Sequence, residues 1–316
     1  MKAICIYILA LLLPNLVTPV RHVLLEAVHR ANVDQVKHLL SLDQEILSSM
    51  PPVIVDKVDD AHGRTPLLVC GLAPGDRDRI ELGKDCVKIA KMLHKRGADM
   101  NHIDSAGWDA VAMGAVRGMT PFCRYLIKYH ELDVNRKDFS GRTALMKAAA
   151  HGYFDTFVML HRRGARLEQE VDGLGMTAMH YGTTFALQNP AQMEFFKNLT
   201  QYVSGNIEQS QSKAQQSILP INIDSFVDPS KRTCLMYAVI SNNVEVSKAL
   251  LAVGADPRKT DTFGVSCLTM TSDDTLREIL SEATAALVEK EHKEWLEHTS
   301  GTERNIQDNS DEYNEF

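Results

Sequence analysis

The chain has 316 residues, of which 44% are hydrophobic, 6% aromatic and 24% charged, and its formal net charge is −7. This composition supplies a core for one large domain or two ordinary ones, and the acidic balance argues against a nucleic-acid-binding protein, which carries a basic face. The acidity is concentrated in residues 273–316, with 13 acidic and 4 basic side chains. We interpret this end as a solvated helix and tail, with a docking site for a basic partner as the alternative.

The chain opens on an apolar leader in residues 1–20, MKAICIYILALLLPNLVTPV. Lys2 followed by an apolar run is typical of a secretory signal, although no small-residue cleavage site follows. The run is also just long enough for a membrane span, and basic residues after it, such as Arg21, would leave the body of the chain in the cytoplasm. An apolar helix packed on the rest of the chain is the third interpretation. We expect membrane association or entry into the secretory pathway, with a cytoplasmic protein as the alternative.

A short phrase recurs along the body of the chain. Its copies are spaced 44, 34, 34, 56 and 33 residues apart. A basic period near 33 residues, with two longer intervals, is typical of a solenoid of stacked repeats. The copies read GRTPL at Gly63, GWDAV at Gly107, GRTAL at Gly141, GMTAM at Gly175, KRTCL at Lys231 and GVSCL at Gly264.

Each copy has the chemistry of a helix start. Its third position holds Thr, Asp or Ser, whose side-chain oxygens accept hydrogen bonds from first-turn N–H groups. Pro66 follows at the first helical position, where proline is tolerated, and the glycine two residues before the cap suits a turn with positive φ. A second amphipathic run follows each helix and ends at Gly97, Gly164 or Gly254. The unit therefore predicts two helices joined by short turns, which bury their apolar faces by stacking on neighbouring units.

The phrase and its period resemble the ankyrin repeat, whose first helix begins T-P-L-H-x-A. Residues 65–67 (TPL) and 177–180 (TAMH) match that helix start, and residues 97–101 (GADMN) match the exit turn. Residues 24–40 fit as a degenerate opening repeat, which gives about seven units over residues 21–280. The resemblance implies an all-α fold, namely an ankyrin-repeat solenoid of stacked helix pairs with short β-hairpin-like turns and a C-terminal capping helix.

Two repeats carry inserts, near residues 71–85 and 183–227. The first is Gly-rich and charged and the second is Ser/Gln-rich in its middle, which predicts surface segments that are either passive or in contact with a partner. After the last repeat, apolar residues at helical spacing predict a capping helix over residues 275–298. The polar, acidic residues 299–316 predict a disordered tail.

No pattern in the chain predicts catalysis, a metal centre or a cofactor site. The body's five cysteines show no CxxC spacing, and we interpret them as reduced core residues. Cys86 and His94 lie two helical turns apart, but no second pair joins them. His180 stands where the ankyrin family has a hydrogen-bonding residue that supports the turn. The motifs of phosphate-binding loops, dinucleotide-binding folds, hydrolases and kinases are absent, so we expect a protein that is not an enzyme.

The resemblance also implies where a partner binds. Ankyrin solenoids present their turn tips and first helices as a concave face for partner proteins, and the fold leaves the tip residues free to vary. The tips of this chain carry aromatic, aliphatic and arginine side chains, and aromatics and arginine are enriched in binding hot spots. The predicted partner-binding residues are His62, Arg64, Trp108, Phe139, Arg142, Leu174, Met176, Arg232 and Phe263.

We therefore interpret the chain as a protein–protein interaction module, a monomer that its leader holds at or passes through a membrane. The alternative is a secreted interaction protein that acts in an extracellular or host setting. The glycosylation sequon at residues 198–200 (NLT) would support that alternative if it carried a glycan, but its expected place in a helix makes it a poor acceptor. A third class, an enzyme with its site in the 183–227 insert, has no motif in its favour.

Overall fold

The chain forms two compact units, residues 1–199 and 200–316. The predicted leader, residues 1–20, and residues 190–192 and 204–221 of the second predicted insert lie outside the described residues. No helix of the described part is long and apolar enough to cross a membrane. The computed structural model describes residues 23–46, 62–74, 78–168, 170–189, 193–203 and 222–312.

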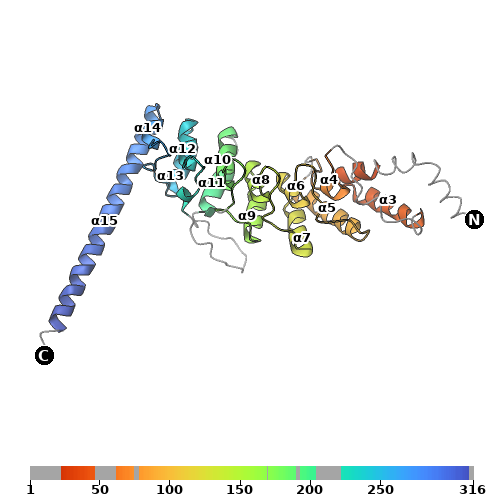
Figure 1. The fold of residues 1–316 in the computed structure, drawn as a ribbon, viewed down its shortest axis with the longest axis horizontal. Coiled ribbons are helices and arrows are strands. Elements are labelled where there is room, and N and C mark those ends of the chain that lie inside the picture. Colours follow the sequence, from red (N-terminus) through yellow and green to blue (C-terminus); the bar gives the residue numbers. More distant parts are fainter. Residues whose placement is uncertain are drawn as a thin grey trace, which may run out of the picture. The chain divides into compact units, whose positions relative to one another are not determined.

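The first unit consists of helix pairs stacked in two layers (Figure 1). First helices α4, α6, α8 and α10 pack on one another, and second helices α3, α5, α7 and α9 do the same. Its described residues contain no strand, in agreement with the predicted all-α fold. Residues 23–29 are helical, and the other bounds are α3 Val33–Ile46, α4 Pro66–Cys70, α5 Arg79–His94, α6 Ala110–Val116, α7 Thr120–His130, α8 Ala144–Ala150, α9 Phe154–Arg162, α10 Ala178–Gln188 and α11 Met193–Val203, which continues past the unit's last residue.

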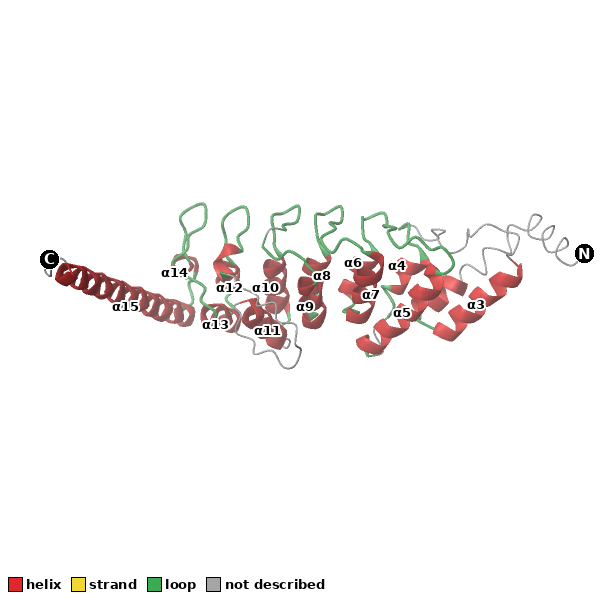
Figure 2. Cartoon of the chain, turned by 90° about the horizontal axis from the view of Figure 1, so that it is seen from below, coloured by secondary structure: helices red, strands yellow, loops and turns green. Residues whose placement is uncertain are grey.

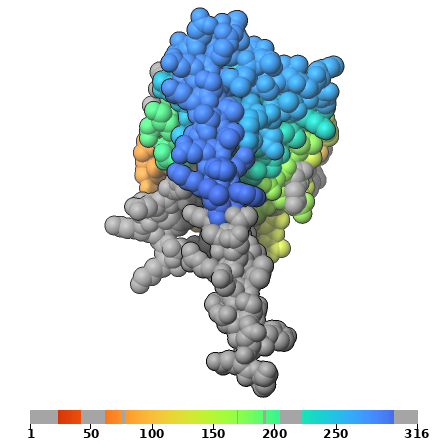
Figure 3. All heavy atoms as spheres, turned by 90° about the vertical axis from the view of Figure 1, so that its left-hand side faces the viewer, coloured from red at the N-terminus to blue at the C-terminus, as the bar shows by residue number. Residues whose placement is uncertain are grey.

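The second unit repeats the helix-pair plan and ends in a long helix. Its helix α15 lies against α13 and α14, and Figure 3 shows it in the deepest blue across the lighter blue surface of those helices. Two isolated antiparallel bridges, Val227 to Thr233 and Thr260 to Ser266, close its turns. The bounds are η2 Ile223–Ser225, α12 Cys234–Ile240, α13 Val244–Ala252, α14 Cys267–Met270 and α15 Asp274–Glu312.

The predicted capping chemistry is present at most first helices. The Asp109 carboxylate accepts from the N–H of Ala112 at 2.7 Å, and Thr143 and Thr233 accept in the same way. At α10 the Nδ1 of His180 accepts from the N–H of Thr177 at 3.2 Å, which confirms its predicted role in supporting the turn. Thr65 differs, because its hydroxyl is buried and makes no capping bond.

Each turn before a first helix is hydrogen-bonded to the next turn of its own unit. The N–H of Phe139 donates to the carbonyl of Ala106 at 3.1 Å, and the N–H of Gly173 donates to Ser140 at 2.9 Å. The turns stack so closely that a Cβ on Gly141, whose φ is +79°, would lie 2.8 Å from the backbone nitrogen of Gly173. Figure 2 shows the turns projecting from one side of the helices.

Both predicted inserts are shorter than the sequence indicated. Helix α5 begins at Arg79, inside the expected 71–85 loop, because Asp78 caps the N–H of Ile80 at 3.0 Å and Leu82 and Cys86 bury one helical face. Within 183–227, helices α10 and α11 extend to residues 188 and 203, and η2 occupies residues 223–225. Phe185 and Phe195 join α10 to α11 with ring centroids 5.4 Å apart.

The C-terminal helix is longer than predicted. Leu276 and Leu280 are fully buried, as expected for the face that covers the last repeat. However, α15 continues through the expected disordered tail to Glu312, where the prediction placed the end of the helix at residue 298. The extension contains no proline and a single glycine, Gly301, so it lacks the residues that stop helices.

The cysteines of the repeats are buried and free, as predicted. The Cys86 thiol donates to the carbonyl of Cys70 at 3.3 Å. Burial raises the pKa of the Cys70 and Cys123 thiols, and it raises the pKa of Cys267 to about 12. The thiolate, which is the reactive form, is therefore both rare and inaccessible in the folded chain. The five are Cys70, Cys86, Cys123, Cys234 and Cys267.

We predict that these five thiols resist modification until the protein unfolds. In a Cys5→Ser variant, the reaction with Ellman's reagent should be at least about 100-fold slower in native buffer than in guanidinium chloride, because each thiol needs local opening to react. The absorbance of the released thionitrobenzoate measures both rates. Prompt modification of even one thiol in native buffer would contradict the burial described above.

Candidate protein-binding surface

A buried aspartate organises each turn that precedes a first helix. The Oδ1 atom of Asp138 accepts from the N–H groups of Ser140 and Arg142, both at 2.9 Å. Asp104 and Asp172 bind the same two positions of their own turns, at 2.8 to 2.9 Å. Because the carboxylate satisfies the turn's N–H groups from inside, the side chains at the tip are not needed for this bonding and point outward.

In three turns the second carboxylate oxygen of the aspartate contacts the first helix nine residues further along the chain. The Tyr181 hydroxyl donates to Asp172 Oδ2 at 2.6 Å, and in the second unit the Tyr237 hydroxyl donates to Asp228 Oδ2 at 2.9 Å. Two effects raise the pKa of each tyrosine to about 12: burial is the larger, and the hydrogen-bonded carboxylate is the smaller. The phenols therefore remain hydrogen-bond donors at neutral pH.

Lys147 occupies the corresponding position of the third turn and makes a buried charge pair. Its side chain is 3% exposed and its ammonium binds Asp138 Oδ2. The same ammonium lies 4.4 Å from the ring centroid of Trp108, which belongs to the preceding repeat. Arg142 adds a second cation, with its Nε 3.4 Å from Asp138 Oδ2. The cation–π contact between Lys147 and Trp108 thus joins two neighbouring repeats, and the ion pair lies within one of them.

The charges of this cluster affect one another's ionisation. Burial disfavours the Asp138 carboxylate, but Lys147 and the Arg142 N–H outweigh burial and hold the pKa of Asp138 below its usual range. Burial lowers the pKa of Lys147, and Asp138 offsets only part of that effect. Asp138 therefore stabilises the fold fully above the ordinary aspartate pKa of about 3.9, and its contribution is lost as the pH falls through the lower pKa of the folded state.

The arginines among the predicted site residues support the turns. Arg64 Nε lies 3.5 Å from Asp104 Oδ2 of the next repeat, and in the second unit Arg232 Nε lies 3.9 Å from Asp261 Oδ2. With Arg142, all three side chains lie over buried turn carboxylates and are about one-third exposed. Their guanidinium groups therefore contribute to turn geometry as well as to the surface.

The apolar tip residues are the most exposed part of the predicted site. Phe139 is 74% exposed and Leu174 is 76% exposed in adjacent turns of the first unit, and Phe263 is 79% exposed in the second unit. His62 is also exposed, whereas Trp108 and Met176 are half-buried. Phe139, Leu174, Trp108 and Met176 lie in consecutive turns of one unit. We call these four residues the tip strip.

Lys147 is the residue of this surface that sequence analysis missed. A lysine within a helix normally indicates a solvated position. The signal that could have revealed it is its register, nine residues after the turn aspartate, where two other repeats carry tyrosine.

The described residues contain no group of three or more metal-ligating side chains. The His94 ring packs against the ring of His130, with centroids 4.6 Å apart.

Comparisons with known proteins agree with this architecture. A family model described as "Ankyrin repeats (3 copies)" matches residues 80–171, and a single-repeat model described as "Ankyrin repeat" matches residues 230–262. The chain is an ankyrin repeat protein. Ankyrin repeats indicate a protein–protein interaction module, and the fold is generally a non-catalytic scaffold.

Solved structures of other ankyrin repeat domains share the fold. The ankyrin repeat domain of Bcl-3, described as a unique member of the IkappaB protein family, is 19% identical with a TM-score of 0.59, over 82% of this chain and 97% of that one. The human ASB11 ankyrin repeat domain is 18% identical with a TM-score of 0.57, over 82% of this chain and 96% of that one. At these identities the likeness shows the fold alone.

We predict that Lys147→Met destabilises the protein by about 3 kcal/mol, because it leaves the Asp138 carboxylate buried without its ammonium partner. Urea unfolding followed by circular dichroism measures the change. The double variant Lys147→Met/Asp138→Asn should recover at least about 1 kcal/mol, since neutralising the carboxylate removes the unpaired charge.

Lys128→Met serves as the control, because Lys128 is exposed and its loss should cost no more than about 0.5 kcal/mol. Simple additivity of the Lys147 and Asp138 substitutions would show that the two charges are not coupled.

Proposed function

We propose that this ankyrin repeat protein binds a partner protein with the concave face of turn tips and first helices, centred on the tip strip. The observation that carries the proposal is the pair Phe139 and Leu174, large apolar side chains each about three-quarters exposed in adjacent turns. Their turns are held by Asp138 and Asp172, so the side chains are presented without being needed for the fold. Rigid presentation of apolar side chains lowers the entropic cost of binding.

The arginines are the second support for a protein partner. Arg64, Arg142 and Arg232 retain about one-third exposure beside the tips, and arginine next to aromatic side chains is a frequent hot-spot combination. His62 and Phe263 extend the same kind of surface within their own units. A partner of this face would thus meet apolar anchors with cationic groups at their edge. We propose that the protein acts in this way as a monomer and without nucleic acid.

We predict that Phe139→Ala/Leu174→Ala weakens the partner at least about tenfold, because two exposed anchors would be lost. Trp108 is less suitable for this test, since its ring contacts Lys147. The partner would be isolated by affinity capture, and its dissociation constant measured with purified proteins by calorimetry. Melting temperature should change by no more than about 2 °C, because these side chains bury little area.

The matched control is Val23→Ala/Tyr129→Ala, which removes two exposed apolar side chains of the same unit that lie on helices and outside the turns of the tip strip. It should leave the affinity within about twofold. Equal affinities for the wild-type protein and the Phe139/Leu174 variant would refute the proposed site.

We further propose that residues 1–20 bring the protein to a membrane or into the secretory pathway, with a secreted interaction protein as the alternative. The apolar run and the following basic residues support an anchor with the repeats in the cytoplasm. Reduced, buried cysteines agree with that compartment. The sequon gives the secreted form little support, because Asn198 lies within α11 and Thr200 is 1% exposed.

Protease protection in intact microsomes tests this proposal. With a C-terminal tag on the full chain, we expect the tag to be digested and the protein to resist alkaline extraction, since an uncleaved anchor would leave the repeats outside the lumen. A protected tag together with a cleaved leader would instead establish the secreted alternative. A protein fully released by alkaline extraction, with an accessible tag, would contradict both forms and support a cytoplasmic protein.

A further inference from the structure

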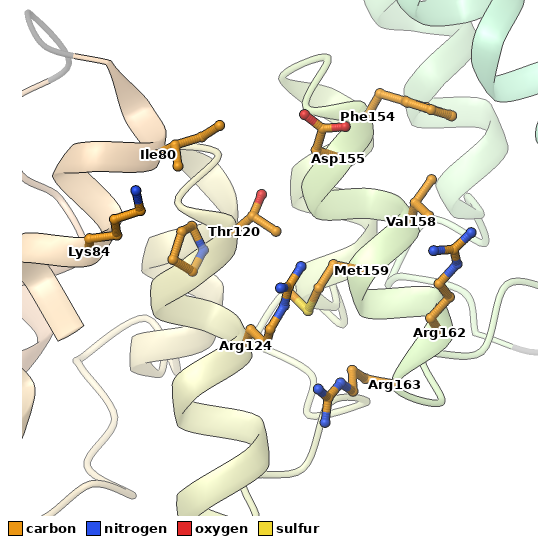
Figure 4. A pocket seen from close by; sticks show the side chains of 11 residues that line it. Ile80, Lys84, Thr120, Arg124, Phe154, Asp155, Val158, Met159, Arg162 and Arg163 are labelled. Carbon is orange, nitrogen blue, oxygen red and sulfur yellow. The ribbon is translucent and has the colours of Figure 1, made fainter. Parts of the chain in front are cut away.

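A groove of about 650 Å³ lies along the second helices of the first unit. Figure 4 shows its wall: Ile80 and Lys84 come from α5, Thr120 and Arg124 from α7 together with Pro121, and the remaining side chains from α9 and the residue after it. A second hollow of about 640 Å³ shares Ile80, Thr120 and two further residues with the groove. Together they form one continuous depression on helices that do not contribute to the tip strip.

Close helix packing creates the apolar part of the groove. Gly83 of α5 faces Pro121 of α7, and a Cβ on Gly83 would lie 2.9 Å from the proline Cδ. The glycine therefore lets α7 approach α5. Ile80 remains 50% exposed at the edge, while Val158 is half-buried on the opposite wall. These two residues offer apolar surface on either side of α7.

The rim of the groove is strongly basic. Lys84, Arg124, Arg162 and Arg163 line it, with Asp155 as its one carboxylate. This contrasts with the chain's overall net charge of −7. The groove thus concentrates positive charge on an acidic protein.

The side chains of Arg124, Arg162 and Arg163 make no hydrogen bond or ion pair with any described residue. Two other arginine side chains behave differently: Arg30 pairs with Glu26 at 2.6 Å, and in the second unit Arg277 pairs with Asp274 at 2.9 Å. Arg124, Arg162 and Arg163 are exposed and keep their full donor capacity. A planar guanidinium with free donors matches a carboxylate, which can accept two parallel hydrogen bonds.

We propose that this groove binds an acidic segment of a partner protein, with its carboxylates on Arg124, Arg162 and Arg163 and an apolar side chain on the apolar wall that Ile80 and Pro121 provide. Charge complementarity selects the acidic segment, and the apolar walls select a segment that also carries an aliphatic residue. The interaction weakens with salt, because its charges lie at the surface.

The test uses a fluorescein-labelled peptide that repeats Glu-Glu-Leu-Glu four times, added to the full chain and followed by fluorescence anisotropy. We expect the protein to bind this peptide. Its affinity for a matched peptide that repeats Gln-Gln-Leu-Gln should be at least about tenfold lower. Reversing two rim charges, Arg124→Glu/Arg163→Glu, should reduce the affinity for the acidic peptide at least about tenfold, which is about 1.4 kcal/mol.

The matched control Lys37→Glu/Lys95→Glu makes the same change in net charge at exposed positions of α3 and just after α5, and it should alter the affinity less than about twofold. Phe139→Ala/Leu174→Ala should keep peptide binding, because the tip strip is separate from the groove. The proposal is overturned if the wild-type protein does not bind the peptide or if the two charge-reversal variants lose affinity equally. Groove-dependent binding to phosphatidylserine vesicles in place of the peptide would overturn it as well.

Discussion

The buried turn carboxylate is the interaction on which the repeats depend. Asp104, Asp138 and Asp172 each accept two N–H groups of their own turn, so a tight turn without a sheet has its backbone satisfied. Because each turn is closed from inside, its outer edge is available to hydrogen-bond to the next turn. The regular stacking of the turns therefore depends on the buried aspartate side chains and not on the exposed tip residues.

The same carboxylates determine which turn residues are needed for the fold and which are free to form a binding surface. The second oxygens of Asp138 and Asp172 bind Lys147 and Tyr181 on the following helix, whereas the second oxygen of Asp104 faces Arg64 of the preceding repeat. These positions are constrained by burial and charge. The residues two places after the aspartates make no such bonds through their side chains, and this is where Leu174 and Phe263 stand, with Phe139 one place after Asp138. Variation at the tips can change the binding surface while the turn beneath remains intact.

The sequence predicted those features that depend on local chemistry. Capping by Asp109 and Thr143 and the bond from His180 require only neighbouring residues, and all three were identified in advance. The burial of Lys147 depends on Trp108 of the preceding repeat, so no local pattern reveals it. The start of α5 was missed because Gly83 is typical of a loop, whereas this glycine is needed for the approach of Pro121.

The groove was missed for a related reason. Lys84, Arg124 and Arg162 lie a repeat length apart, and each by itself is typical of a solvated helix face. Only stacking places their side chains around one depression.

The presence of turns and second helices within one stacked unit has a consequence for stoichiometry. The tip strip precedes the first helices, and the groove is formed by α5, α7 and α9, so a ligand on one surface leaves the other uncovered. A single copy thus has the geometry to bridge two different proteins in a ternary complex. Alternatively, one long chain that reaches both surfaces would gain avidity, because its second contact forms at the high effective concentration set by the first. In either case the repeat stack serves as a fixed spacer, because the turns and the second helices that carry the two surfaces belong to the same stacked repeats.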